Sequence, residues 1–386
     1  MLRGLVGAML LLLLSACESL GFYAQAVSGQ FSILLLRQDV DVVLTRLAEA
    51  ERPEDQRLGE RLAYTQELLA FASDQLGLEV GGRYSSFVQL DAAYPLWNVF
   101  AAPELSVSPH AWCYPLVGCA PYRGYFRRAR AEGYAARLRR RGLETHVGGV
   151  PAYSTLGWFS DPLLSSFVYW PDAELAELLF HELAHGKVWV RSDVAFNEAF
   201  ATFVGRQGAA QLLGSTPMAP VREGGEHRMT QLLLILRERL QGVYESPRSH
   251  EEKRRAKSAL LGEARACYAE NPQYFGAPRF DGVMQRLNNA YLASLVTYED
   301  HVPAFAKLFE THGGDWAHFF AAVQEIAELE PARRRSRLAT LGQQRVAGQS
   351  DDARADQIEC ETLPGHGVDA ESSRTEDDDI RRGGHG

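Results

Sequence analysis

Two histidines and a glutamate form the group of residues in this sequence that is best suited to chemistry. Residues 181 to 185 read His-Glu-Leu-Ala-His. On a helix, His181 and His185 project from the same face one turn apart, so both imidazoles can reach one metal ion. A zinc ion held by two imidazoles and a carboxylate keeps an open position for water and lowers the pKa of that water to about 7. Glu182 is then placed to accept the proton and to return it to a leaving amine.

A third ligand must come from another part of the chain. A histidine six residues after His185 would complete one common zinc site, but that position holds Arg191. Glu198 is the predicted ligand, because residues 186 to 197 are long enough for a turn that brings a second helix antiparallel to the first. Asp193 is the alternative, although its position before an apolar run favours capping of that second helix. The predicted zinc ligands are therefore His181, His185 and Glu198.

The helix that must carry the two histidines is predicted over residues 173 to 188. Pro171 marks its start, and Asp172 is the candidate capping residue. The flanking residues are apolar or small, as a buried helix requires: Ala176, Leu179, Phe180, Leu183 and Ala184. Buried histidines without partners would cost free energy, and a metal ion provides one partner. The alternative is a core helix whose histidines are satisfied by hydrogen bonds.

The N-terminus resembles a bacterial lipoprotein signal. An apolar run at Leu10–Leu14 follows Arg3 and is too short to span a bilayer. The string Leu14-Ser15-Ala16-Cys17 resembles a lipobox, in which the signal is cut before a cysteine that then carries lipid. The sequence therefore predicts a signal peptide over residues 1–16 and lipidation at Cys17. The alternative is an ordinary signal peptide or an anchor helix that happens to contain a cysteine.

The residue after the predicted lipidation site indicates a destination. Glu18 stands where an aspartate would resemble the signal for retention in the inner membrane. We therefore expect a protein anchored in the outer membrane and facing the periplasm, with the membrane as a partner through its lipid.

Export also determines how the other cysteines are interpreted, because the periplasm is oxidising. Cys113 and Cys119 are close in sequence and are predicted to form a disulfide. A zinc site built from these two would need a second cysteine pair, which the sequence lacks. Cys267 and Cys360 could pair with each other or stay free.

Helical periodicity dominates the rest of the chain. Two amphipathic helices separated at Pro53 are expected over residues 40–78, and short strands and loops over 81–122. Residues 21–36 are apolar with interspersed glutamines, typical of a helix that lies near the membrane or packs on the domain. Helices fill nearly all of the second half. The predicted fold class is α+β and predominantly helical, in one domain over residues 17–342, followed by a disordered acidic tail over 343–386.

The bulk composition excludes one class of partner. The formal net charge of the 386 residues is −9, and no nucleic-acid-binding motif is present. Such a chain has no general attraction to phosphate backbones, so nucleic acid is not expected to bind. The 46% hydrophobic content is sufficient for a sizeable core.

The motifs together resemble two groups of proteins. The pair of histidines followed by Asn197-Glu198 resembles the gluzincins, zinc peptidases that use two histidines and a glutamate, although the spacing here is shorter. A closer resemblance is to the bacterial putative aminopeptidase lipoprotein family. It rests on the strings Cys119–Phe126, Ala152–Pro162, Phe180–His185, Phe196–Glu198 and Leu287–Ala290. The resemblance implies a zincin-like metallopeptidase domain that binds Zn2+ and acts on a peptide or protein substrate.

The gluzincin resemblance also implies a residue opposite the metal that stabilises the oxyanion. Tyr298 is the first candidate, and Tyr291 and Tyr153 are alternatives. Each could instead be a packing tyrosine. The predicted function is zinc-dependent hydrolysis of peptide bonds, with aminopeptidase activity implied by the resemblance. An endopeptidase or another amidohydrolase using the same site is one alternative, and a non-catalytic binding lipoprotein is another.

Overall fold

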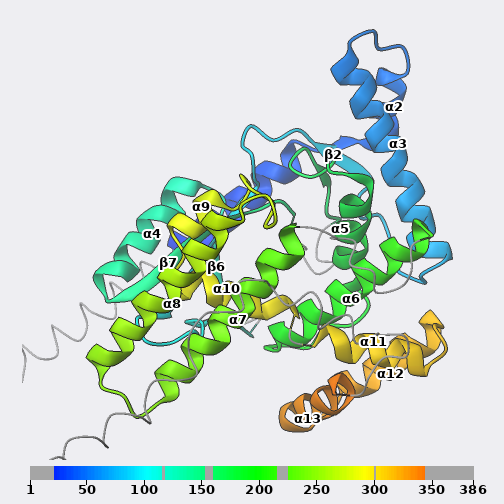
Figure 1. The fold of residues 1–386 in the computed structure, drawn as a ribbon. Coiled ribbons are helices and arrows are strands. Elements are labelled where there is room, and N and C mark those ends of the chain that lie inside the picture. Colours follow the sequence, from blue (N-terminus) through cyan, green and yellow to red (C-terminus); the bar gives the residue numbers. More distant parts are fainter. Residues whose placement is uncertain (1–20, 115–117, 153–159, 215–224, 300, 344–386) are drawn as a thin grey trace, which may run out of the picture.

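The computed structural model describes residues 21–114, 118–152, 160–214, 225–299 and 301–343 (Figure 1). Several predictions concern residues outside this part: the signal peptide at 1–16, Cys17, Tyr153, Cys360, the tail after Gln343 and the side chain of Tyr298.

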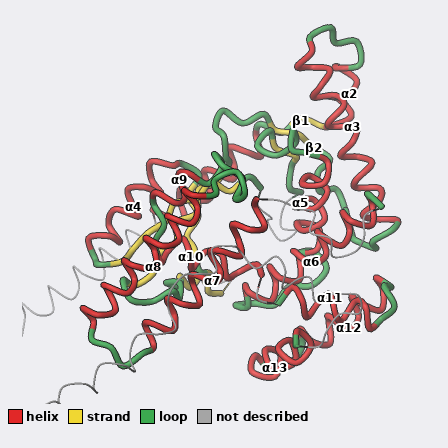
Figure 2. Tube along the Cα trace, in the orientation of Figure 1, coloured by secondary structure: helices red, strands yellow, loops and turns green. Residues whose placement is uncertain are grey.

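Helices make up most of the described chain, and strands are few and short (Figure 2). Residues 21–35 are helical. The further helices are α2 (Val40–Leu47), α3 (Pro53–Asp74), α4 (Arg128–Arg140), α5 (Asp172–Ala184), α6 (Val194–Leu212), α7 (Gly225–Glu245), α8 (His250–Glu270), α9 (Asp281–Gln285), α10 (Asn289–Glu299), α11 (Val302–Thr311), α12 (Trp316–Ala327) and α13 (Pro331–Gly342). The strands are β1 (Gln38–Asp39), β2 (Ser86–Val88), β3 (Leu96–Pro103), β4 (Trp112–Tyr114), β5 (Gly118–Ala120), β6 (Tyr122–Tyr125), β7 (Leu143–Val150) and β8 (Leu163–Leu164). This mostly helical structure with small sheets agrees with the predicted α+β class.

The main sheet is antiparallel, with the strand order β6-β3-β7. Side chains along β3 alternate between two faces, as the geometry of a strand requires. Val99 and Ala101 are fully buried in a cluster with residues of α4. Ala102 faces the other way and packs with Ala290 and Ala293 of α10. The sheet is therefore covered by α4 on one face and by α10 on the other.

The hydrophobic interior is divided into separate clusters. The largest cluster includes α3, α5, α6, α11 and α12, and a second is formed mainly by α7, α8 and the start of α10. In Figure 1, α5 and α11 to α13 lie on the right, and α4, α7 and α8 lie toward the left. Helix α10 connects the two parts, because it contacts α6, α7 and β3.

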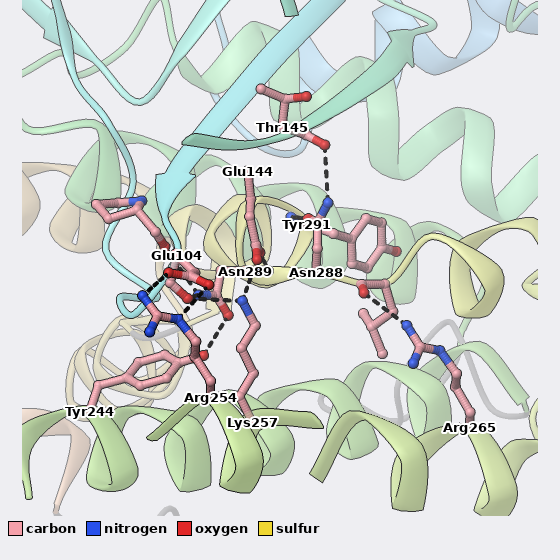
Figure 3. A network of polar contacts seen from close by, with 12 residues as sticks. Glu104, Glu144, Thr145, Tyr244, Arg254, Lys257, Arg265, Asn288, Asn289 and Tyr291 are labelled. Carbon is pink, nitrogen blue, oxygen red and sulfur yellow. Dashed lines mark hydrogen bonds and ion pairs between the residues drawn. The ribbon is translucent and has the colours of Figure 1, made fainter. Parts of the chain in front are cut away.

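A polar network fastens α10 to the ends of β3 and β7 (Figure 3). The Asn289 side chain donates to the carbonyls of Pro103 and Glu104 at 3.1 and 2.8 Å, and its backbone N–H donates to Glu144 at 2.7 Å. Lys257 of α8 contacts the same Glu144 carboxylate and donates to the Glu104 carbonyl at 2.8 Å. Asn289 is fully buried, so these bonds satisfy groups that would otherwise be costly to bury.

Most predicted elements are present, with changes at their ends. The helix break at Pro53 is confirmed, since Pro53 begins α3. Two details of the predicted histidine helix are wrong. Its N-cap is Pro171, whereas Asp172 is the first residue of the helix and its carboxylate accepts from Arg61. The helix ends at Ala184 rather than Val188, and Gly186 and Lys187 continue in a tight turn bonded to the carbonyls of Leu183 and Ala184.

A small hairpin formed by β4 and β5 contains a disulfide between Cys113 and Cys119. The same two residues face each other in the hairpin register. Cys267, buried in α8, is also disulfide-bonded. Within the described residues, no helix combines the length and apolar character needed to cross a bilayer.

Candidate metal centre

The site is built where α5 and α6 pack against each other. Gly205 of α6 lies at the closest approach, because a Cβ there would be 2.6 Å from the Glu177 carbonyl and 3.2 Å from the Cβ of His181. Ala201, one turn earlier, is fully buried. Small residues of α6 therefore lie where the two helices meet, and Gly205 comes closest to α5.

This helix pair brings His181, His185 and Glu198 together. The Nε2 atoms of His181 and His185 are 3.3 and 3.8 Å from Oε2 of Glu198. One ligand atom from each of the three residues lies within 4.8 Å of the others. The side chains are 15%, 6% and 9% exposed, so the group is shielded from solvent but can still be reached at His181.

The loop between the two helices is fixed by Asn197. Its side chain is fully buried, accepts a hydrogen bond from the Val190 N–H and donates one to the Val190 carbonyl, each at 2.8 Å. These two hydrogen bonds to the backbone of Val190 hold Asn197, the residue directly before Glu198, in place. The sequence predicts no structural role for Asn197, although the pair Asn197-Glu198 is part of the resemblance to gluzincins.

The disulfide-bonded hairpin rests on the same loop. Gly118 and Ser192 both have positive φ angles, 85° and 63°. They are in such close contact that a Cβ on Gly118 would overlap the Ser192 hydroxyl. Glycine is therefore required at this position both by its conformation and by the available space.

Asp193 takes the structural role that the sequence favoured for it. Its carboxylate caps α6 by accepting from the Phe196 N–H at 3.2 Å. Its other oxygen accepts from Arg334 of α13 at 2.7 Å. Capping by Asp193 is confirmed, and the group of candidate metal ligands contains Glu198 instead.

Glu182 lies beside the ligands without belonging to their group. It is only 9% exposed. Burial raises the pKa of Glu182 to about 7, with the charge of His181 acting against the shift and the charges of Glu198 and Asp161 adding to it. A carboxyl group with this pKa can both accept and release a proton near neutral pH, as a general base requires.

The two histidines have different electrostatic surroundings. Burial alone would lower the pKa of His181, but its hydrogen bond to Glu198 and the neighbouring carboxylates outweigh burial and raise it. Burial lowers the pKa of His185 to about 4, so this imidazole is neutral at physiological pH. Neutral imidazole is the form that binds metals.

Tyr122 lies in β6 and has no role in the sequence analysis. Burial raises the pKa of its phenol, and the carboxylates of Glu198 and Glu182 add to the shift. Tyr122 is paired with Phe100 across the sheet, and their rings are 5.7 Å apart. Its side chain is partly exposed, whereas Tyr84, whose pKa is also raised by burial and by the charge of Glu182, is only 3% exposed. Tyr122 is therefore a candidate for a role at the site that the sequence did not suggest.

The other tyrosine candidates lie elsewhere or outside the description. Tyr291 packs edge-on against His146 of β7, with 4.8 Å between the ring centres. Tyr298 belongs to α10, but its side chain is not described, and Tyr153 lies outside the described residues.

The three converging residues fit a tetrahedral zinc ion. Zinc binds imidazole nitrogen and carboxylate oxygen at about 2.0–2.2 Å, which separates neighbouring ligand atoms by roughly 3.4 Å. The two separations between a histidine Nε2 and Glu198, 3.3 and 3.8 Å, are close to this value. The buried Nδ1 atom of His185 has no hydrogen-bond partner among the described residues, and its ring lies edge-on to those of His181 and Trp189, with 4.8 and 5.5 Å between ring centres.

Comparison with known proteins identifies a family for most of the chain, including the residues of this site. The model of a family described as “Putative aminopeptidase” matches residues 21–338, which include both helices, the sheet and α10. No curated protein and no solved structure matches the chain. Because the family model extends over most of the sequence, the chain belongs to this aminopeptidase family.

Proposed function

We propose that this protein is a zinc-dependent peptidase with a zincin-like domain, and that it removes N-terminal residues from peptides. The observation that carries the proposal is the convergence of His181, His185 and Glu198, with a buried general base beside them. The description of the family supports the substrate class. The lipobox-like string ending at Cys17 supports attachment to the bacterial envelope, with the outer membrane as the proposed location.

Each side chain has a separate task in this proposal. His181, His185 and Glu198 would hold the zinc ion. When bound, the ion would polarise the scissile carbonyl and activate a water for attack. Glu182 accepts the proton of the attacking water and returns it to the leaving amine. Tyr122 is assigned the donation of a hydrogen bond to the oxygen on which negative charge develops, and Tyr298, whose side chain is not described, stays the alternative from the sequence.

The decisive experiment changes the base without changing the ligands. Glu182→Gln keeps the shape of the side chain, so the variant should fold and retain zinc, as measured by elemental analysis. Its rate of peptide hydrolysis should fall by at least about a hundredfold, the lower end of what a positioned general base contributes. Glu174→Gln is the matched control, because Glu174 lies in the first turn of the same helix.

The substrate set separates the remaining alternatives. An aminopeptidase cleaves peptides with a free N-terminus and rejects acetylated ones, whereas an endopeptidase cleaves both. If the zinc-loaded wild-type protein cleaves neither faster than Glu182→Gln does, the peptidase proposal is wrong. The protein would then be a metal-containing binding lipoprotein.

A further inference from the structure

The helix formed by residues 21–35 is apolar on its outer side as well as on its inner side. It contains no charged residue. Its buried side includes Gln25, whose amide donates to the Gly124 carbonyl and whose oxygen accepts from the Phe126 N–H, both at 3.2 Å. Its outer side carries large apolar residues spaced four apart, which we call the outer stripe: Tyr23, Val27, Phe31 and Leu35, exposed by 42%, 56%, 57% and 83%. A surface helix normally presents charged and polar residues on its outer side.

The inner side of this helix is firmly fixed to the domain. Phe22 packs against Tyr125 with 5.7 Å between ring centres, and Arg123 stacks on Phe22 at 4.1 Å. Gly29 lies against the ring of Phe126, and Ile33 is buried in the largest core cluster. The helix therefore cannot rotate its apolar residues inward without breaking these contacts.

The exposed apolar surface is concentrated on this helix. Nine large hydrophobic residues are exposed in the described part of the chain, and five of them fall within residues 21–36. Single exposed hydrophobic residues are ordinary, but a contiguous row marks an interaction surface. The helix is also too short to cross a bilayer, which would require roughly 20 residues.

The neighbouring sequence indicates what covers the stripe. Cys17, the proposed lipidation site, is four residues before Gly21, so at most about 14 Å of chain separates the lipid from the helix. Arg127 and Arg130 follow closely after Phe126, whose ring lies against Gly29 of the helix, and both arginines are exposed. Exposed apolar side chains with cationic ones nearby are typical of helices that lie in the surface of an anionic bilayer.

We propose that the outer stripe lies in the phospholipid surface of the membrane. The stripe would then be a second attachment, in addition to the lipid on Cys17. One lipid anchor near a protein leaves the domain free to rotate, whereas an anchor and an adjacent buried helix fix one face toward the membrane. The proposal rests on the anchored location given under the proposed function. Its test is arranged so that the anchor and the helix can fail separately.

Photo-cross-linking in cells tests the contact in the complete protein. With Phe31→p-benzoylphenylalanine, illumination should give phospholipid adducts detected by mass spectrometry. The control is Ile235→p-benzoylphenylalanine on α7, an apolar position that is 40% exposed and should give none. Equal lipid adducts at both positions, or an adduct of two protein chains at Phe31, would overturn the proposal.

Labelling of the same cells with a fatty-acid analogue reports on the anchor alone. Label on the protein without lipid adducts at Phe31 would leave the anchor intact and refute the membrane contact of the helix. Adducts at Phe31 without label would support the helix contact and refute the anchor.

Vesicle binding gives the strength of the contact without the anchor. The chain beginning at Glu18, secreted behind a non-lipoprotein signal, should sediment with vesicles of phosphatidylethanolamine and phosphatidylglycerol. The variant Phe31→Ser/Leu35→Ser should bind at least about tenfold more weakly. Leu213→Ser/Ile235→Ser removes comparable exposed apolar groups elsewhere and should bind like the wild type. Equal binding by both variants would contradict the proposal, provided that melting curves show both to be folded.

Discussion

Glu198 and Asp193 are five residues apart and both carry carboxylates, but their surroundings assign them different tasks. Glu198 faces two imidazoles, whereas Asp193 faces a helix N-terminus and Arg334. We expect Glu198→Ala to lose most of its zinc, because one of three ligands is removed. Asp193→Ala should keep its zinc but lose about 2–4 kcal/mol of stability, because a cap and the partner of a buried guanidinium disappear.

Zinc content by elemental analysis and unfolding by denaturant distinguish the two variants. If Asp193→Ala lost zinc while still folded, and Glu198→Ala kept it, the third ligand would have to be reassigned to Asp193.

Tyr122 can be tested against the tyrosine that the sequence favoured. Tyr122→Phe removes only the hydroxyl, so folding and zinc content should be preserved. The loss of one hydrogen bond to the developing charge should lower kcat roughly a hundredfold with little change in KM. Tyr298→Phe is the comparison, and it should remain close to the wild type. A large loss of kcat in Tyr298→Phe with none in Tyr122→Phe would return the role to Tyr298.

The difference between these residues shows what a sequence can and cannot predict about a site. His181 and His185 were identified because helical spacing alone places them on one face. Tyr122 is positioned by the pairing of β6 with β3, a contact between residues that are not neighbours in the chain. No local pattern encodes such contacts, so a tyrosine within the predicted region of short strands had no signal of its role.

At the scale of elements, the fit between α5 and α6 controls the site. Gly205→Ala would place a methyl group 2.6 Å from the Glu177 carbonyl, and the helices would have to separate. We expect a loss of about 1–3 kcal/mol of stability and weaker zinc binding, because His181 and Glu198 come from opposite helices. The measurement is unfolding by denaturant together with zinc titration of the apoprotein.

Gly262→Ala is the control for this change, because Gly262 lies in the exposed part of α8 with nothing near its missing Cβ. It should stabilise the protein by about 0.5–1 kcal/mol, the usual gain when alanine replaces glycine in a helix. If Gly205→Ala behaved like Gly262→Ala, the helix contact would not be as tight as described.

Helix ends were harder to predict than helix positions, because some of them also depend on contacts between residues that are far apart in the sequence. Pro53 and Asp193 act on the turn in which they stand, so their effect could be anticipated from local sequence. Asp172 is a residue type that often caps helices, but it is the first residue of α5, and its carboxylate accepts from Arg61, which is 111 residues away in sequence. A contact with such a distant partner has no local signal in the sequence.

At the scale of the whole molecule, the network in Figure 3 joins α8 and α10 to the sheet. Lys257 and Glu144 have side chains that are 10% and 24% exposed. Lys257→Met should cost about 2–4 kcal/mol at neutral pH, because it leaves the Glu144 carboxylate without its cationic partner. Adding Glu144→Gln should recover part of this loss, since the charge that lacks a partner is then removed.

Arg254→Met is the matched control on the same helix. The side chains of its ion pair with Glu104 are about half exposed, so removal of Arg254 should change the stability much less than removal of Lys257. Denaturant unfolding of the four proteins measures all these effects. A loss for Lys257→Met no larger than that for Arg254→Met would mean that the network does not hold the layers together.

The division of the interior into separate cores has a consequence for how the molecule opens. All three candidate ligand residues lie in α5, at its C-cap or in α6, which pack in the largest core, and none belongs to the α7–α8 core. A bound ion stabilises only the cooperative unit that contains its ligands. Metal binding would therefore raise the cost of opening α5 and α6 while the α7–α8 layer kept its own, separate opening equilibrium. Local unfolding of α5 and α6 would then depend on the metal concentration, and local unfolding of α7 and α8 would not.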